Sequence, residues 1–275
     1  MNTLVSTDEL AQHPEWRVFD CRHDLARPAL GEQQYLEAHI PGAVFAHMDR
    51  DLSGPTTGRN GRHPLPEARS FIAWLGRQGV TPDTQVVCYD AGPGASAARL
   101  WWMLRWIGHE NVAVLDGGLA KWQREGRPVT AELPQVQAAV YPGKPRASML
   151  ASLALVEKKL KRAAFLDARA PVRWRGEQEP IDPVAGRIPG AKNRFHTENL
   201  QADDTLKPAD VLKQEFLAVL GDRSPAEVIN YCGSGVSACH NALAMEIAGF
   251  TGSRVYIGSW SEWCADPTRP IARSA

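Results

Sequence analysis

The chain repeats itself once within its 275 residues. Short segments of the first half return in the same order in the second half. An offset of 148 residues separates HIPGA at 39–43 from RIPGA at 187–191, and an offset of 141 residues separates Ile107 from Ala248. Self-similarity at a nearly constant offset is the signature of a repeated structural unit. A tandem duplication therefore constrains the fold, because one architecture must suit both halves.

Within each half, short strands alternate with helices. Val86–Tyr89 and Val228–Tyr231 are apolar runs of strand length, whereas residues 97–107 and 238–249 carry apolar residues at helical spacing. Strands that alternate with helices are typical of α/β units. We therefore predict two α/β domains, each with a small, mainly parallel sheet and helices on both faces.

The two halves meet in a segment rich in Pro, Ala and Gln. We predict a first domain over residues 1–126, a linker over 127–147 and a second domain over 148–275. The chain is long enough for each domain to have a hydrophobic core of its own.

The charge and cysteine content exclude several classes of protein. Lys and Arg total 31, as do Asp and Glu, so no global field would recruit nucleic acid or an anionic membrane. No apolar run reaches the length of about 18–20 residues that a membrane span needs, and the first residues lack the regions of a signal peptide. The five cysteines are widely spread without a CxxC pair, which argues against a disulfide framework or a zinc site. We expect free thiols in a cytoplasmic protein.

A cysteine-containing turn follows the predicted strand Val228–Tyr231. It reads CGSGVS over residues 232–237 and leads directly into the predicted helix. A turn with two glycines can curl so that its backbone N–H groups point inward, and the helix N-terminus adds partial positive charge. A cysteine facing such a cradle loses its proton more readily, and the thiolate is the nucleophile. We predict Cys232 as the catalytic nucleophile; the alternative is a buried structural cysteine at the end of a strand.

The equivalent turn of the first half has no cysteine. Asp90 stands where the second half has Cys232, and AGPG follows it at 91–94. We predict that the first domain keeps the fold but is not catalytic.

Two kinds of reaction use a cysteine in an anion-binding turn. Phosphate-ester and arsenate chemistry needs an arginine at the end of the loop that grips the oxyanion in a bidentate manner. Here that position is Ala238, and no arginine occurs between Cys232 and Gly252. Transfer of a sulfane sulfur needs no such side chain, because backbone N–H groups can stabilise the terminal sulfur of a cysteine persulfide. Sulfur transfer is therefore favoured, with a cysteine-dependent phosphatase or arsenate reductase as the weaker alternative.

Several separated motifs, taken together, resemble one known family. Segments of the types Asp-x-Arg and HIPGA recur in both halves, DGGxxxW at 116–122 is echoed by IGSxxxW at 257–263, and CGSGVS occurs in the second half. In this order, from about Ser6 to Pro270, they look like a two-domain rhodanese-type sulfurtransferase. The resemblance implies tandem rhodanese-like domains, a persulfide on Cys232, a ping-pong cycle and neither a metal nor an organic cofactor.

The resemblance also implies how a sulfur donor is held. Thiosulfate-type members typically carry basic residues after the cysteine, whereas mercaptopyruvate-type members have CGSGVT, to which CGSGVS at 232–237 is similar. The loop residues with an implied substrate-binding role are Gly233, Gly235, Val236 and Ser237. Arg173, in RWRGE, matches the first of two arginines that are thought to bind the donor's carboxylate; the alternative is a structural ion pair. The second arginine is missing, since its register falls at residues 181–182, and Arg187 is a candidate substitute.

A proton relay is a further implication of the resemblance. It would link Ser234 to His63 and Asp49, both from the first half of the chain. Such a relay is chemically sensible, because a thiol donor must lose its proton as its sulfur is attacked. The alternatives are that His63 and Asp49 are solvated loop residues and that Ser234 is a turn residue.

We therefore predict a monomeric sulfurtransferase that moves a sulfane sulfur from thiosulfate or 3-mercaptopyruvate to cyanide or a thiol. Its partners would be these small molecules, without nucleic acid or membrane. A function of another class stays open: a non-catalytic persulfide carrier or binding module. The two functions differ in whether the protein shows catalytic turnover that depends on Cys232.

Overall fold

The computed structural model of the chain describes residues 3–274, which form two compact units. The first unit contains the chain up to Gly54, together with Leu65–Arg146 and Gln201–Leu206. The second unit contains Pro55–Pro64, Ala147–Leu200 and the chain from Lys207 onward. Residues 55–64, which lie in the first half of the sequence, therefore belong to the second unit. The domain limits predicted from the sequence stay a prediction.

The first unit has a five-stranded sheet in which all neighbouring strands are parallel. In spatial order the strands are β1 (Leu4–Val5), β5 (Val112–Leu115), β4 (Val86–Tyr89), β2 (Arg17–Asp20) and β3 (Val44–Phe45). The helices of this unit are α1 (Thr7–Ala11), α2 (Leu30–Glu37), α3 (Ala68–Arg77), α4 (Ala95–Trp106) and α5 (Gly118–Arg124).

Helices cover both faces of this sheet. Successive residues of a strand point to opposite faces. Val18 of β2 packs in one core with Leu10 of α1 and Trp122 of α5. Phe19, the next residue, contacts Trp74 of α3 on the other face, with ring centroids 5.5 Å apart. Helix α4 packs along β4 and β5.

The second unit repeats this plan with a four-stranded parallel sheet. In spatial order its strands are β7 (Lys192–Asn193), β6 (Ala164–Asp167), β8 (Val228–Tyr231) and β9 (Arg254–Val255). Its α-helices are α6 (Leu153–Lys159), α7 (Pro171–Arg175), α8 (Ala209–Leu220), α9 (Ser237–Ile247) and α10 (Ser259–Trp263). Short 3-10 helices cover Ala147–Met149, His196–Asn199 and Pro225–Glu227.

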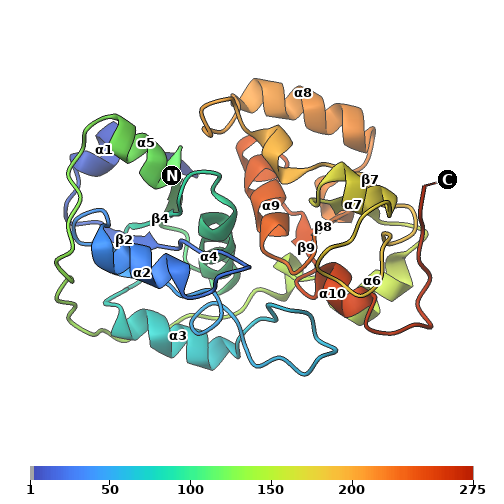
Figure 1. Cartoon of the computed structure of the whole chain (residues 1–275), viewed down its shortest axis with the longest axis horizontal. Helices are drawn as coiled ribbons and strands as arrows, with labels where there is room; N and C mark the ends of the chain where they lie inside the picture. Colours follow the sequence, from blue (N-terminus) through green and yellow to red (C-terminus); the bar gives the residue numbers. More distant parts are fainter. Residues whose placement is uncertain (1–2, 275) are drawn as a thin grey trace. The chain divides into compact units, whose positions relative to one another are not determined.

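Both faces of the second sheet are also covered. Ile229 of β8 packs with Val156 of α6 and Trp260 of α10. Asn230, the next residue, reaches α9 on the other face, where its Nδ2 lies 3.6 Å from Sδ of Met245. Figure 1 shows α9 beside β8 and β9, and α8 packs against α9. The predicted fold class, two α/β units with parallel sheets between helices, is confirmed.

The duplication extends to buried charges beside each sheet. In the first unit, Arg22 Nη2 donates to Asp20 Oδ2 at 2.6 Å and to a backbone carbonyl at 2.7 Å. In the second unit, Arg169 Nη2 makes the same two bonds, to Asp167 Oδ2 at 2.7 Å and to a backbone carbonyl at 2.7 Å. A buried charge is costly unless it is paired and hydrogen-bonded. This requirement explains why the Asp-x-Arg motif recurs in both halves.

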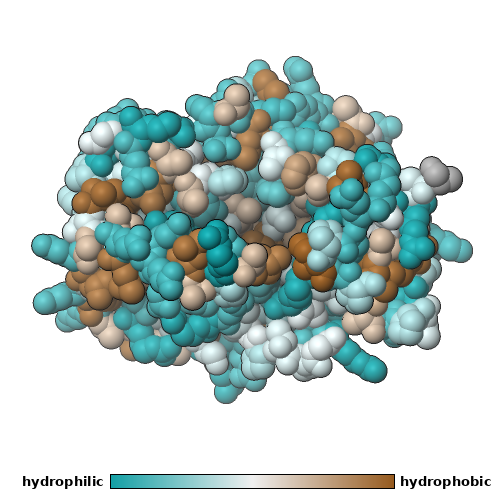
Figure 2. Space-filling model, viewed as in Figure 1, coloured by the Kyte–Doolittle hydropathy of each residue, from teal (hydrophilic) through white to brown (hydrophobic). Residues whose placement is uncertain are grey.

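One face of the molecular surface can be described by its hydropathy. On the face drawn in Figure 2, hydrophilic residues predominate and apolar residues form separate patches among them. Within residues 3–274, no helix combines the length and the hydropathy that a membrane crossing requires.

Candidate active site

Cys232 lies directly after β8, at the start of the turn that leads into α9. The backbone N–H of Gly235 donates to its Sγ at 3.1 Å, so the turn directs a backbone N–H toward the sulfur. Gly235 adopts a left-handed φ of 78°. A Cβ at this position would lie 2.3 Å from the carbonyl oxygen of Ile257, so a side chain does not fit without a shift of the backbone. Glycine is therefore needed here for the bond to the sulfur.

Ser259 accepts a hydrogen bond from the backbone of Cys232. Its Oγ accepts from the N–H of Cys232 at 3.1 Å, donates to the carbonyl of Tyr256 at 2.8 Å and lies 4.0 Å from the Cys232 sulfur. Ser259 is fully buried and has a φ of 53°. Such strain in a residue other than glycine is found where the surroundings fix it, often at functional sites. Sequence reasoning missed Ser259, although its place directly after Gly258 in the repeated motif was a signal.

The equivalent turn of the first unit surrounds a carboxylate with backbone N–H groups. The carboxylate of Asp90 accepts from the N–H groups of Gly92 at 3.1 Å, Gly94 at 2.9 Å, Ser96 at 2.9 Å and Ala97 at 3.3 Å. Burial raises the pKa of Asp90, and these four N–H groups oppose the rise. The turn thus acts as a receptor for a negatively charged group, which in the first unit is supplied by the chain itself.

Ser234 and His63 lie together in the second unit. Nδ1 of His63 is 2.8 Å from Oγ of Ser234, and both side chains are buried. His63 is on Pro55–Pro64, which explains how a residue of the first half reaches this loop. Asp49 belongs to the first unit, where its N–H donates to His47 Nδ1 at 3.1 Å. Its part in the relay stays a prediction.

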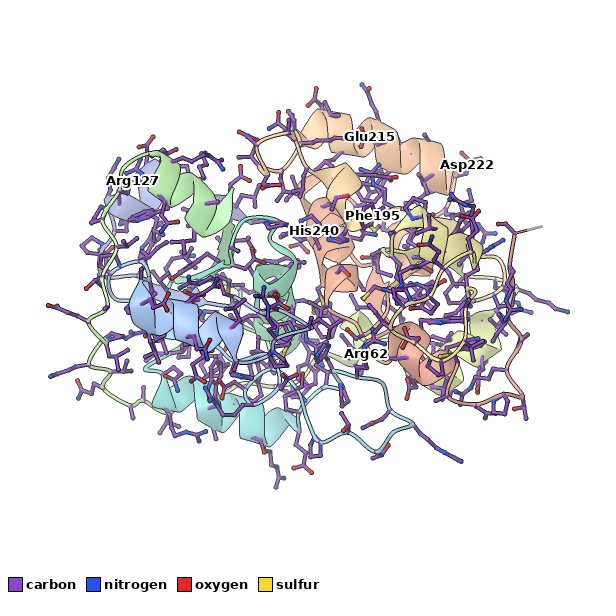
Figure 3. The ribbon with its side chains drawn as sticks, viewed as in Figure 1. Arg62, Arg127, Phe195, Glu215, Asp222 and His240 are labelled. Carbon is purple, nitrogen blue, oxygen red and sulfur yellow. The ribbon has the colours of Figure 1, made fainter. Side chains whose placement is uncertain are left out.

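Two arginines flank Gly233. A Cβ on Gly233 would lie 2.7 Å from Nη2 of Arg62 and 3.5 Å from Nη2 of Arg173. The sequence pointed to Arg173, which is on α7, but not to Arg62, which directly precedes His63. Arg62 lies beside α10 (Figure 3), and its N–H donates to Oγ of Ser261 at 3.1 Å. Two cationic groups therefore lie next to the cysteine loop.

Carboxylates hold both arginines. Arg173 makes a fork to Glu179, with Nε–Oε1 at 3.0 Å and Nη2–Oε1 at 2.6 Å, and Nη2 also reaches Asp182 Oδ2 at 3.1 Å. Arg62 Nη1 pairs with Oδ1 of Asp182. Burial opposes ionisation of Glu179, but hydrogen bonds from Arg173 and from backbone N–H groups hold its pKa below the ordinary value. Burial raises the pKa of Asp182, against the attraction of both arginines.

Arg187 is engaged elsewhere in the second unit. Its Nη1 donates to the carbonyl of Trp174 and to Oγ of Ser274, each at 3.1 Å, and its guanidinium lies 4.2 Å from the Trp174 ring centroid. Its predicted contact with a donor is untested. Val236 and Ser237, also predicted to contact the donor, lie where α9 begins.

An open pocket of about 820 Å³ adjoins this site within the second unit. Its lining includes Arg59, Arg62, His63, Asp182 and Ser261. In the described part of the chain, no three His, Cys, Asp or Glu side chains come together as a metal site would require. The site therefore combines a buried cysteine whose sulfur accepts a backbone N–H, a Ser–His pair and two arginines beside a pocket.

Three comparisons with known proteins show the family to which this chain belongs. The family model described as "Rhodanese-like domain" matches residues 5–125 and again 152–266. A Pseudomonas aeruginosa protein named "Probable 3-mercaptopyruvate sulfurtransferase" is 47% identical, over 98% of this chain and 97% of that protein. The thiosulfate sulfurtransferase of Mus musculus is 36% identical, over 94% of this chain and 91% of that protein. The structure of 3-mercaptopyruvate sulfurtransferase from Leishmania major is similar with a TM-score of 0.84 and 30% identity, over 95% of this chain and 74% of that one.

These matches confirm the predicted family and the predicted class of enzyme, a sulfurtransferase. The chain belongs to the rhodanese family and carries two rhodanese-like domains in tandem.

Proposed function

We propose that Cys232 takes a sulfane sulfur from 3-mercaptopyruvate, with thiosulfate as a second donor, and passes it to cyanide or a thiol. The observation that carries this proposal is the set of contacts around one turn. The Cys232 sulfur accepts the N–H of Gly235 at 3.1 Å, and the next polar residue of the turn, Ser234, pairs with His63 at 2.8 Å. The first pair serves the nucleophile, and the second can move a proton.

In the first half of the cycle, the Cys232 thiolate attacks the sulfur of the donor. The new S–S bond forms as the C–S bond of mercaptopyruvate breaks, and the carbon leaves as the enolate of pyruvate. The proton of the donor thiol is passed by Ser234 and His63 and ends on that carbon. Charge-assisted hydrogen bonds from loop N–H groups stabilise the terminal sulfur of the persulfide, as the first unit's turn stabilises Asp90.

In the second half, the acceptor attacks the terminal sulfur and Cys232 leaves as the thiolate. Cyanide becomes thiocyanate, and a thiol becomes a persulfide. Arg62 and Arg173 lie next to Gly233 and would bind the donor's carboxylate, since a guanidinium suits a planar carboxylate. Arg62 thus supplies the second cation that the sequence register did not provide.

The relatives support this choice of donors. A Pseudomonas aeruginosa relative at 47% identity is named for 3-mercaptopyruvate, and a mouse relative at 36% identity is named for thiosulfate. The Ser234–His63 pair favours mercaptopyruvate, because thiosulfate has no proton to lose. We further propose that the protein acts as a monomer in the cytoplasm on small molecules alone, which size-exclusion chromatography with light scattering and cell fractionation would test.

The test is steady-state thiocyanate formation from each donor, together with mass spectrometry of the isolated intermediate. We expect turnover with both donors and a mass increase of one sulfur atom on Cys232. Cys232→Ser should abolish both, whereas Cys88→Ala, a cysteine change in the first unit, should keep both. A persulfide on Cys232 without turnover would point to the carrier alternative, and neither persulfide nor turnover would refute the proposal.

A further inference from the structure

The two arginines beside the cysteine loop belong to a larger chain of ion pairs. Carboxylates and guanidinium groups alternate along it, in the order Asp167, Arg169, Glu179, Arg173, Asp182 and Arg62. Three carboxylates thus neutralise three guanidinium groups, and all six side chains are at most a quarter exposed. Although two cations lie at the donor site, the network that contains them carries no net charge.

Asp182 lies between the two arginines that flank Gly233. Its Oδ1 pairs with Arg62 and its Oδ2 lies 3.1 Å from Nη2 of Arg173, so one carboxylate bridges the two arginines next to Gly233. Its side chain is 3% exposed and it lines the pocket beside the loop. A donor anion must therefore share these guanidinium groups with a carboxylate that the enzyme itself supplies.

The balance of charge affects donors differently. A donor with one negative charge adds a single charge to a neutral network and can use guanidinium N–H groups that Asp182 leaves open. A donor with two negative charges brings twice the negative charge close to Asp182 and to the Cys232 thiolate, and both of these groups repel it. Part-buried like charges repel strongly, so the free-energy cost of binding a donor grows with the negative charge of that donor.

We propose that Asp182 is a specificity-determining residue that makes the site prefer a monoanionic donor, such as 3-mercaptopyruvate, to a dianionic one, such as thiosulfate. The inference rests on the proposed function, because it concerns the donor of that same reaction. In this role Asp182 acts in the opposite sense to the arginines. The arginines attract anionic donors, whereas Asp182 repels them and repels a dianion more than a monoanion.

A pH dependence of donor preference follows from this role. Burial raises the pKa of Asp182, so its negative charge is lost at a higher pH than for an ordinary aspartate. The other charged groups that act on it are Arg62, Glu179, Arg173 and Arg169, in that order of effect. As the pH falls toward that raised pKa, the neutral side chain opposes a dianion less. Discrimination against thiosulfate should therefore weaken in acid, and a variant without this carboxyl should lose that dependence.

The first test compares donors within each variant. The ratio of kcat/KM for thiosulfate to kcat/KM for mercaptopyruvate does not depend on the amount of folded enzyme. Asp182→Asn should raise this ratio by about tenfold or more, since one unit of charge is removed at a part-buried site. Asp182→Glu keeps the charge and should stay within about twofold of the wild type. Asp266→Asn removes an exposed carboxylate that pairs with Arg269, and its ratio should also stay within about twofold of the wild type.

The second test does not need turnover. Alkylation of Cys232 by iodoacetate, an anion, is compared with alkylation by neutral iodoacetamide, and the product is located by mass spectrometry. Asp182→Asn should raise the rate ratio of iodoacetate to iodoacetamide by about tenfold, with no such change in Asp182→Glu or Asp266→Asn. An unchanged or lower ratio in Asp182→Asn would overturn the role of Asp182. Absence of donor turnover in the wild type would refute the proposed function instead, and the alkylation ratio would still decide on Asp182.

Discussion

Gly235→Ala tests whether the backbone N–H of Gly235 serves the Cys232 sulfur. The same change also tests whether the turn needs a glycine at this position. Gly235 has a φ of 78° and donates its N–H to the Cys232 sulfur at 3.1 Å. An added Cβ would lie 2.3 Å from the carbonyl oxygen of Ile257, a contact that real Cβ atoms essentially never make. Because that oxygen is backbone, the turn itself has to move.

Two costs can be separated. The left-handed conformation costs an alanine about 1–2 kcal/mol of folding stability. The shift of the turn lengthens or breaks the N–H bond to sulfur, and a hydrogen bond to a charged group contributes about 1.5–3 kcal/mol. If that bond stabilises the thiolate and the persulfide, kcat/KM for sulfur transfer should fall by about 10- to 150-fold.

Gly249→Ala is the matched control. Gly249 follows α9, has a φ of 83° and has open space around an added Cβ. It should therefore show the conformational cost alone, with a loss of about 1–2 kcal/mol in the free energy of unfolding and an unchanged rate.

Thiocyanate formation with saturating cyanide gives the rate, and denaturant unfolding gives the stability of both variants. If Gly235→Ala keeps kcat/KM within twofold of Gly249→Ala, the N–H of Gly235 does not serve the sulfur and the cradle argument fails. Equal losses of stability in the two variants would show that the turn absorbs the Cβ without strain.

Changes at three further residues probe the surroundings of Cys232. Ser234→Ala removes the partner of His63 and should lower kcat by about 10²–10⁴-fold with mercaptopyruvate but much less with thiosulfate, measured as steady-state kinetics for each donor. Ser259→Ala leaves the buried N–H of Cys232 without its acceptor and should cost about 1–3 kcal/mol of stability, whereas Ser259→Gly should recover about 1 kcal/mol of that by relieving the positive φ, both measured by denaturant unfolding. Glu179→Gln should cost about 3 kcal/mol at neutral pH, because it leaves buried arginines short of a partner, and the same unfolding assay would show it.

The pH dependence of the Glu179→Gln effect follows from the direction of its pKa. A carboxyl whose pKa is lower in the folded protein stabilises the fold above its unfolded pKa, about 4.3, and loses that contribution as the pH falls through the folded value. The difference between wild type and Glu179→Gln should therefore be full at neutral pH and shrink in acid. A pH-independent difference would show that the lost contribution is packing and not charge.

Equal slowing of both donors by Ser234→Ala would contradict the proton relay. Equal stability of Ser259→Ala and Ser259→Gly would contradict the backbone strain at Ser259.

The repeat determined much of the fold at the level of sequence. Buried runs such as Val86–Tyr89 and Val228–Tyr231 are strands in the structure, and helices follow them as predicted. Local patterns were sufficient here, because strand length, helical spacing and glycine-rich turns depend on neighbouring residues. For the same reason the cysteine turn was found: its residues are consecutive, and the chemistry of Cys232 depends on N–H groups a few positions away.

The surroundings of that turn were decided by tertiary structure. His63 and Ser234 are 171 residues apart in the chain, and Arg62 and Asp182 are 120 apart, yet each pair is in contact. No periodicity links such residues, because their contact depends on how Pro55–Pro64 packs within the second unit. The sequence pointed to Arg173 through a local motif, but it could not show that Asp182 lies between Arg173 and Arg62. The candidate nucleophile could therefore be predicted from a short stretch of sequence. The charge around it is a sum over side chains that folding brings together, so it could not.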